Sequence, residues 1–460
     1  MSASVIFQPL PVNKVVFNNR ILRSSVGGRT CNYDGTVTDV WKNFEKRFAD
    51  HGVGGIISTT FHVNKARLSP LQYPSIADGK YVPYLKKYIP LIQQRDTLDC
   101  KYIVQIGDPG YTTYSSLFPE DRDAVSSSSG FDGAFGYNNT RHEMSDKDIQ
   151  TSIAEFVAAA ARVRETGADG VEITATKGYL IHQFLNPGIN RRNDNWGGDA
   201  ERRFHFLKRI VEDVRLKVGH DYLLGIRLSA ADFNYNPALL ALFRSPWPFL
   251  SRELRLGNEL PQMLEYGREL EALKVNYLHI VSGYGFPNPR DVPGKFPFDE
   301  IRMFFDSVRH LSLKAAVRAA AVHFPPDFLT RWLLNLGWHF EPGINLAFAR
   351  EFKRAVKLPV IVNGGFQDRT LIERALAESK GGLDDGCDLV SMARPLIANC
   401  DLVQQFRRGV DVPDRACTHC NKCVGRTTTS PLGCYDVSRF GGSQQKMVEE
   451  ILNWNRADPA

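Results

Sequence analysis

The sequence predicts an α/β fold, specifically a (β/α)8 TIM barrel, and two observations support that prediction. Short, continuously apolar runs recur eight times along the chain, as parallel strands buried on both faces do. Most of them follow an amphipathic stretch that ends in glycine or a short polar link, as in IAEFVAAAARVRETGADGVEI. The runs are residues 21–25, 53–59, 101–106, 170–174, 223–229, 277–282, 358–365 and 387–393. Eight strands that alternate with helices favour a closed barrel.

A doubly wound open sheet is the alternative arrangement of the same elements. Such sheets often carry GxGxxG or GxxxxGK[ST] directly after a strand, and the sequence has neither pattern in that position. This absence favours the barrel.

Composition and charge exclude several classes of protein. The chain has 460 residues, of which 43% are hydrophobic and 23% charged, as in an ordinary globular protein. The net charge of +6 is mild and no run of Lys and Arg exceeds two residues, so nucleic-acid binding is poorly supported. The N-terminus lacks the pattern of a signal peptide, and no window of about 18 uncharged apolar residues occurs. We expect a cytoplasmic protein without an integral membrane segment.

Two segments look like insertions after strand ends, at about 233–262 and 298–342. Both are rich in aromatic residues and should overhang the mouth of the barrel. The second has helical periodicity, and we favour a packed helical subdomain or a substrate lid over a dimer contact or a membrane-surface patch. We expect the barrel to span residues 1–410, with a Cys-rich extension at 411–460 packed on it.

Polar and flexible residues gather where the predicted strands end, which is where barrel enzymes carry their active sites. The clearest example of a polar residue at a strand end is Arg227, in GIRLSA. A guanidinium at the end of a buried strand requires an anionic partner. That partner is either a ligand or an acidic side chain of the protein itself. The other strand-end residues are Ser25, Val26, Thr60, Gln105, Thr174, Lys177, Tyr179, Ser282, Gly364, Gly365, Ala393 and Arg394.

The segment after the fourth run, VEITATKGYLIHQFLNPGINRRNDNWGGDAERRF, resembles the old yellow enzyme family of FMN-dependent oxidoreductases. It is also similar to the barrel part of 2,4-dienoyl-CoA reductases. The family's usual form is E-I-H-x-x-[HN]-G-Y-L-x-x-Q-F-L-x-P. Further landmarks follow in the family's order: FQPL, VQIGDPG, GIRLSAADF, VNGGF and ARPLIANCDLVQQF. The resemblance covers most of residues 7–436 and implies a monomeric or homodimeric enzyme that binds FMN, NAD(P)H and a small-molecule alkene.

The resemblance also assigns cofactor contacts residue by residue. Gln105 would face the pyrimidine edge of the flavin, and Arg227 would face its N1/O2 edge, where reduced flavin is anionic. Gly27 occupies a position where many relatives have Thr or Cys. A bound flavin would therefore lack the contact that this Thr or Cys side chain makes in those relatives. The remaining expected contacts are Ser25, Val26 and Thr60 at the isoalloxazine, and Gly364, Gly365, Ala393 and Arg394 at the phosphate.

The catalytic residues are kept only in part. Tyr179 matches the tyrosine that gives a proton to Cα while flavin N5 gives hydride to Cβ. Thr174 and Lys177 replace the pair that holds the substrate carbonyl, and both can still donate hydrogen bonds. Alternatively, Lys177 pairs with a nearby acid or points away, and the chemistry has changed. His182 and Asp194 with its neighbours are expected to be structural.

We therefore expect reduction of the activated C=C bond of α,β-unsaturated carbonyl compounds with NAD(P)H. A flavin-dependent isomerase, or a biosynthetic redox enzyme for one specific metabolite, is the alternative that the altered Thr174 and Lys177 allow. A third possibility is a metal-stabilised binding protein whose barrel has lost FMN.

Four cysteines form a C-x2-C-x2-C-x10-C cluster: Cys417, Cys420, Cys423 and Cys434. Four thiolates at such spacings can bind zinc or an iron–sulfur cluster. The dienoyl-CoA reductase branch holds a [4Fe–4S] cluster with gaps of two, three and eleven, so two of the gaps here are one residue shorter. We expect unliganded structural cysteines, with the iron–sulfur cluster or zinc as the alternatives.

Overall fold

The structure is a computed structural model of the chain. It describes residues 4–68, 71–94, 96–111, 124–131, 140–234, 252, 256–286, 288–311, 313–324, 326–377 and 386–453.

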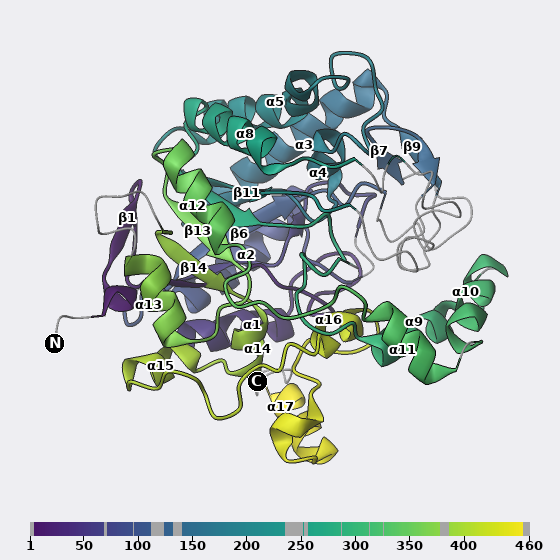
Figure 1. The fold of residues 1–460 in the computed structure, drawn as a ribbon. Helices are drawn as coiled ribbons and strands as arrows, with labels where there is room; N and C mark the ends of the chain where they lie inside the picture. The colour runs from purple at the N-terminus through teal and green to yellow at the C-terminus, as the bar shows by residue number, and fades with distance from the viewer. Residues whose placement is uncertain are drawn as a thin grey trace.

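Eight parallel strands form the closed barrel that the sequence predicts (Figure 1). The strands are β3 (Ile21–Arg23), β4 (Gly55–Ile57), β6 (Lys101–Gly107), β10 (Gly170–Ala175), β11 (Leu223–Ser229), β12 (Tyr277–Val281), β13 (Val360–Asn363) and β14 (Leu389–Met392). Each pairs in parallel with the next, and β14 closes the barrel by pairing with β3. β5 (Phe61–His62) adds a short pairing to the end of β6. All eight apolar runs are therefore strands.

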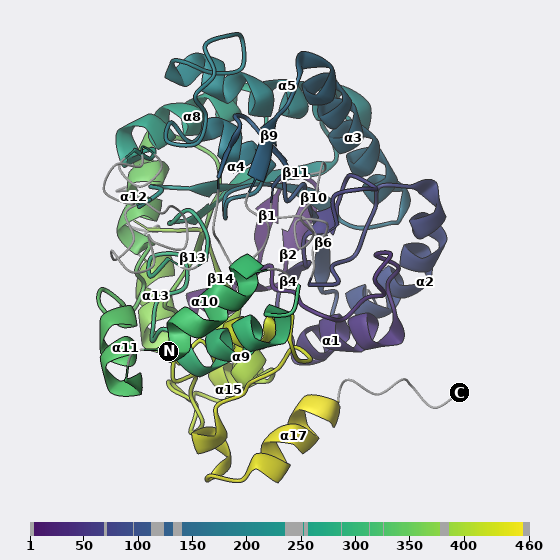
Figure 2. The same ribbon diagram turned by 90° about the vertical axis from the view of Figure 1, so that its right-hand side faces the viewer.

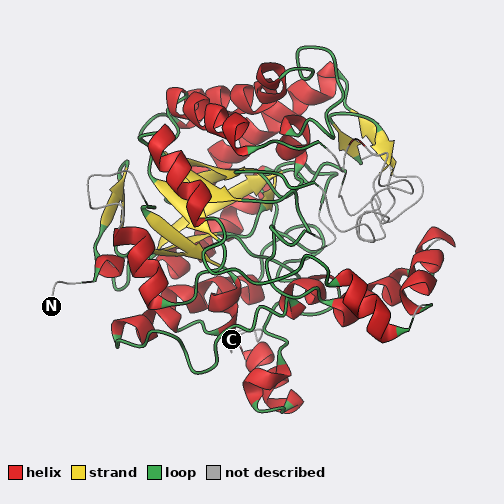
Figure 3. Cartoon of the chain, viewed as in Figure 1, coloured by secondary structure: helices red, strands yellow, loops and turns green. Residues whose placement is uncertain are grey.

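Helices cover the outside of the barrel (Figure 3). They are α1 (Asp39–Asp50), α2 (Val82–Gln93), α3 (Asp146–Glu165), α4 (Leu180–Leu185), α5 (Ala200–Val218), α8 (Leu260–Ala272), α12 (Leu346–Ala355), α13 (Arg369–Ala377), α14 (Arg394–Ala398) and α15 (Leu402–Arg407). Their apolar faces and the outward side chains of the strands form the largest core cluster. No helix in the described part of the chain combines the length and apolar character that crossing a bilayer requires.

An apolar plug closes the N-terminal end of the barrel. The hairpin of β1 (Leu10–Val12) and β2 (Val15–Phe17) lies across this end, on the left in Figure 1. Its Val12 and Phe17 pack against inward side chains of the strands: Leu22, Ile57, Ile103, Leu223, Tyr277, Ile361 and Leu389. This end of the barrel is therefore filled by side chains, and the opposite end is the one that can hold a ligand.

Inserted helices lie over the opposite, C-terminal face, which Figure 2 views directly. The second predicted insertion forms α9 (Phe298–Val308), α10 (Leu313–His323) and α11 (Asp327–Leu334), as its helical periodicity indicates. The Cys-rich extension contains α16 (Lys422–Gly425) and α17 (Gln444–Asn453). Most of the first predicted insertion, residues 235–251 and 253–255, lies outside the described residues.

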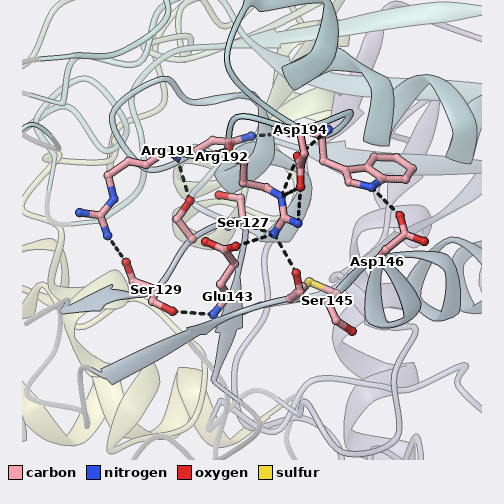
Figure 4. Close-up of polar contacts among 12 residues, drawn as sticks. Ser127, Ser129, Glu143, Ser145, Asp146, Arg191, Arg192 and Asp194 are labelled. Atoms are coloured by element: carbon pink, nitrogen blue, oxygen red, sulfur yellow. Dashed lines mark hydrogen bonds and ion pairs between the residues drawn. The ribbon is translucent and has the colours of Figure 1, made fainter.

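The loop around Asp194 is held by a dense polar network (Figure 4). The Arg192 guanidinium donates to both carboxylate oxygens of Asp194 and, at 2.7 Å, to the carbonyl oxygen of Met144. Trp196 Nε1 donates to Asp146 Oδ1 at 2.8 Å. These contacts join the loop after α4 to the start of α3, so the role of Asp194 is architectural.

Candidate active site

A cavity of about 330 Å³ opens at the C-terminal ends of the strands. Its volume suits a small-molecule site. All the catalytic and FMN-contact residues that the resemblance assigns line this cavity, except Gly365, whereas the strand-end residue Ser282 does not line it. Gly365 follows the lining residue Gly364, and its φ of +74° is one that side-chain-bearing residues rarely adopt. The barrel topology thus brings the strand-end residues together, whereas their individual roles stay predictions.

Arg227 presents a buried cation to this cavity. It lies at the end of β11, beside Thr174 of β10. Burial lowers the pKa of Arg227, and the Glu172 carboxylate opposes that effect. Among the described residues Arg227 forms no ion pair, and its Nε has no hydrogen-bond partner. A buried, unpartnered guanidinium is costly, so its position fits an anionic ligand group better than an internal salt bridge.

A buried polar layer supports the floor of the cavity. Gln105 Nε2 donates to Glu172 Oε1 at 2.6 Å, and Ser391 Oγ lies 2.9 Å from His279 Nε2. Because Glu172 Oε2 accepts a hydrogen bond at 3.0 Å from His279 Nδ1, the Nε2 atom of a neutral His279 accepts from Ser391. Burial lowers the pKa of His279, which favours this neutral ring. On its other side, the Gln105 amide oxygen Oε1 accepts hydrogen bonds from the hydroxyl groups of Ser25 and Thr60.

Sequence reasoning missed Glu172 and His279 as members of this site. The signal was present, since both are charged or titratable residues within otherwise apolar strand runs, GVEIT and YLHIVS. Such residues are almost never fully buried unless they are paired.

Lys177 is paired with an acid, which is one of the alternatives that the sequence left open. Its Nζ forms an ion pair with the Asp291 carboxylate and lies 3.2 Å from the Asp291 carbonyl oxygen. Burial, and after it the charges of Arg227 and Arg394, lower the pKa of Lys177 well below its usual value, whereas an adjacent carboxylate favours the charged form. Both partners line the cavity. At the two positions where the resemblance predicts a carbonyl-binding pair, the structure thus has Thr174 and a Lys177–Asp291 ion pair.

A buried His–Asp pair holds the turn that carries Lys177 and Tyr179. The Gly178 N–H donates to His182 Nδ1 at 3.1 Å, so His182 Nε2 carries the proton that binds Asp232 Oδ1 at 2.8 Å. Both side chains of this pair are fully buried. The expected structural role of His182 is confirmed, because this ring fixes the backbone between the two catalytic candidates.

Tyr179 is the residue directly before α4, and it lines the cavity. Burial raises the pKa of Tyr179 to about 12, despite a hydrogen bond with Thr60 that lowers it. The phenol is therefore protonated at neutral pH and can serve as an acid.

Three of the residues that line the cavity suit a phosphate group. They are Gly364, whose φ is +122°, Ala393 and Arg394. Glycine backbone lets N–H groups approach a phosphate closely, and a guanidinium adds charge-assisted hydrogen bonds. Arg394 Nη1 also donates to the Pro293 carbonyl oxygen at 2.6 Å and to the Asn421 side chain. Together with Arg227, these residues fit a phosphorylated, anionic cofactor such as FMN.

The Cys-rich extension supplies part of the wall of the cavity, which the sequence did not reveal. Its lining residues are Cys423, Val424, Gly425, Thr427, Thr428 and Leu432. Arg29, from the loop after β3, donates to the Thr428 carbonyl oxygen and ties the extension to the barrel. Cys417, Cys420, Cys423 and Cys434 are all free thiols. Within the described ranges no group of three or more His, Cys, Asp or Glu side chains is arranged to hold a metal ion.

Comparison with known proteins gives a consistent family. Residues 5–238 match the model of the NADH:flavin oxidoreductase / NADH oxidase family. The chain is 25% identical over 460 residues to an NADH oxidase of Thermoanaerobacter brockii, covering 95% of this chain and 58% of that protein. It is 22% identical over 463 residues to a cinnamate reductase of Clostridium sporogenes, covering 97% of this chain and 60% of that protein. The chain thus spans less than two thirds of the length of these relatives.

A solved structure agrees at the level of the fold. The old yellow enzyme homologue from Zymomonas mobilis superposes with a TM-score of 0.63 at 19% identity, over 90% of this chain and 96% of that one.

Proposed function

Since the chain belongs to the NADH:flavin oxidoreductase / NADH oxidase family, that of the old yellow enzymes, we propose that it is an FMN-dependent ene-reductase. It would use NAD(P)H to reduce the activated C=C bond of α,β-unsaturated carbonyl compounds. The observation that carries the proposal is the buried, unpartnered guanidinium of Arg227, facing a cavity that Gln105 and Arg394 also line. The cavity is at the end of the barrel where such enzymes act.

The residues divide into cofactor and substrate groups. Bound FMN would supply hydride transfer between NAD(P)H and the alkene. Tyr179 would give the proton to Cα, and Thr174 and Lys177 would hold the carbonyl oxygen. The residues that would hold FMN are Ser25, Val26, Gly27, Thr60, Gln105, Arg227, Gly364, Gly365, Ala393 and Arg394. A Cβ at Gly107 would lie 2.5 Å from Thr174 Cγ2, so glycine is the residue that fits between these groups. We also propose the division into a barrel at 1–410 and an extension at 411–460 that completes the cavity wall.

The visible spectrum of the purified protein, followed anaerobically, tests this function. We expect flavin bands that bleach when NADPH or NADH is added and return when cyclohexenone is added. A protein that stays colourless after incubation with FMN would contradict the cofactor assignment.

The Lys177–Asp291 ion pair favours a second candidate, a redox enzyme for one specific metabolite. A Lys–Asp pair offers both a hydrogen-bond donor and an acceptor, and it suits a substrate that carries both groups beside the alkene. Bands that bleach with NAD(P)H but return with no generic enone would favour this candidate over the first.

Replacing Lys177 by Met should weaken the binding of a carbonyl ligand by roughly 10- to 100-fold, the value of a hydrogen bond from a charged donor. Titration with cyclohexanone, followed by the perturbation of the flavin bands, measures the dissociation constant. Asp291→Asn is the matched variant, because it frees the Lys177 ammonium and should leave binding equal or tighter. If Lys177 only serves the ion pair, neither variant will change the dissociation constant.

A further inference from the structure

Gly27 lies in the cavity wall at a position that leaves no room for a side chain. Its φ is outside the positive range that favours glycine, so the backbone alone would accept a residue with a side chain. A Cβ at position 27, however, would clash with Thr59 Cγ2 and would lie 2.8 Å from Thr59 Oγ1 and 3.0 Å from Tyr73 Cε1. Two neighbouring side chains therefore occupy the space that a Thr or Cys side chain at this position would need.

Of these two side chains, Tyr73 is the one that reaches the cavity. Tyr73 lines the cavity together with Ser25, Val26 and Gly27, whereas Thr59 does not line it. The Thr59 hydroxyl instead donates to the Val26 carbonyl oxygen at 2.6 Å, which holds the backbone beside Gly27. Cε1 of Tyr73 is bonded to the ring carbon that carries the hydroxyl. The hydroxyl half of the Tyr73 ring therefore lies against position 27.

Contacts with β5 hold the Tyr73 ring in place. The ring stacks on the fully buried ring of His62, with 5.9 Å between the centroids and 14° between the planes, which is typical of an offset-stacked pair. Burial lowers the pKa of His62 to about 4, so this ring is neutral at neutral pH. His62 N donates to the Pro74 carbonyl oxygen at 2.9 Å, and Ile76 N donates to that of His62 at 3.0 Å. These bonds fix the backbone that follows Tyr73.

We propose that Tyr73 supplies the contact with bound FMN that Gly27 cannot make, and that the Tyr73 hydroxyl stabilises the reduced flavin. This inference rests on the FMN site of the proposed function. Reduction adds electrons to the flavin ring system, so a hydroxyl that donates to a flavin oxygen or nitrogen binds the reduced form more strongly than the oxidised form. The contact would thus come from the loop after β5 instead of the loop after β3.

The midpoint potential of FMN bound to the full chain, measured anaerobically by equilibration with a reference dye, tests the proposal. Tyr73→Phe removes only the hydroxyl. Reduced FMN should then lose about tenfold more affinity than oxidised FMN, because a hydrogen bond to a charged group is stronger than one to a neutral group by about that factor. For a two-electron couple this difference lowers the midpoint potential by about 30 mV. The dissociation constant of oxidised FMN, measured by the quenching of flavin fluorescence, should rise by about two- to tenfold.

Tyr284→Phe is the matched control for this experiment. It also removes a phenol hydroxyl from the cavity wall, but Tyr284 lies beside Gly178, where a Cβ would be 3.5 Å from Tyr284 Cε1. We expect the Tyr284→Phe variant to keep the wild-type midpoint potential. Circular dichroism of both variants shows whether each one keeps the fold of the wild type.

Three results would overturn the proposal while the proposed function stands, provided that the wild-type protein binds FMN. One is a Tyr73→Phe variant with the wild-type midpoint potential, and another is an equal fall of the potential in Tyr284→Phe. The third is a Tyr73→Phe variant that keeps the potential and weakens only the binding of cyclohexanone, since the hydroxyl would then face the substrate. A wild-type protein that binds no FMN would overturn the proposed function together with this inference. The measurement involves no alkene, so it is independent of the substrate.

Discussion

Replacing Tyr179 by Phe should lower the rate of alkene reduction by about 10²- to 10⁴-fold, the usual contribution of a general acid. The hydroxyl is the only atom removed, and the ring that lines the cavity is kept. Reduction of the flavin by NAD(P)H requires no proton from this phenol, so that half-reaction should be nearly unchanged. Anaerobic stopped-flow absorbance measures the two half-reactions separately. An equal fall in both would show that Tyr179 is not the proton donor.

The pH dependence follows from the raised pKa of Tyr179. Burial favours the neutral phenol and raises its pKa to about 12, so the acid form is fully present below that value and is lost only as pH approaches it. We therefore expect no fall in the alkene half-reaction between neutral pH and about pH 9 from this group.

Tyr284→Phe is the matched control for Tyr179→Phe. Tyr284 also lines the cavity, and its hydroxyl oxygen lies 3.4 Å from that of Tyr111. We expect this variant to keep most of the alkene activity. A large loss in Tyr284→Phe together with a small loss in Tyr179→Phe would transfer the proton-donor role to the Tyr111–Tyr284 pair.

The strands of the barrel were predictable because a strand buried on both faces is a continuous apolar run in the sequence. Such a run can be recognised without knowing which strand pairs with it. A run such as KYIVQI can hardly be anything but an internal strand when turn signals flank it. Once the order of eight parallel strands is fixed, their C-terminal ends must converge. Thr174 and Arg227 are thus neighbours across β10 and β11 although they are far apart in the sequence.

The partners of these residues were not predictable, because tertiary contacts without a motif decide them. Asp291 lies 114 residues after Lys177, in a loop whose path depends on the inserted helices that follow it. In the same way, nothing in CTHCNKCVGRTTTSPLGC shows that Cys423 and Leu432 complete the cavity wall. The sequence identified which residues could carry chemistry, while the packing of loops over the barrel determined what they face.

Replacing Glu45 by Ala should lower the free energy of unfolding by about 3–5 kcal/mol, the cost of leaving a buried charge without its partner. Arg23 at the end of β3 and Glu45 on α1 form an ion pair in which both side chains are completely buried. Burial lowers the pKa of Arg23. A guanidinium nevertheless resists deprotonation in proteins, so we expect Arg23 to stay charged at neutral pH when Glu45 is removed. Its remaining hydrogen bonds go to the carbonyl oxygens of Ser24, at 3.1 Å, and Ile57, at 2.9 Å. Urea titration at a fixed FMN concentration measures the loss.

Two further variants separate the cost of the lone charge from the value of the pair. Lys46→Ala removes the neighbouring Lys46–Asp50 pair on α1, whose side chains are more than a third exposed, and should cost less than about 1 kcal/mol. The double variant Arg23→Met with Glu45→Leu removes both buried charges, so we expect most of the stability lost in Glu45→Ala to return. If the double variant stays as unstable as Glu45→Ala, the pair itself stabilises the junction of β3 and α1. If Glu45→Ala costs no more than Lys46→Ala, water reaches Arg23 in solution and the prediction is wrong.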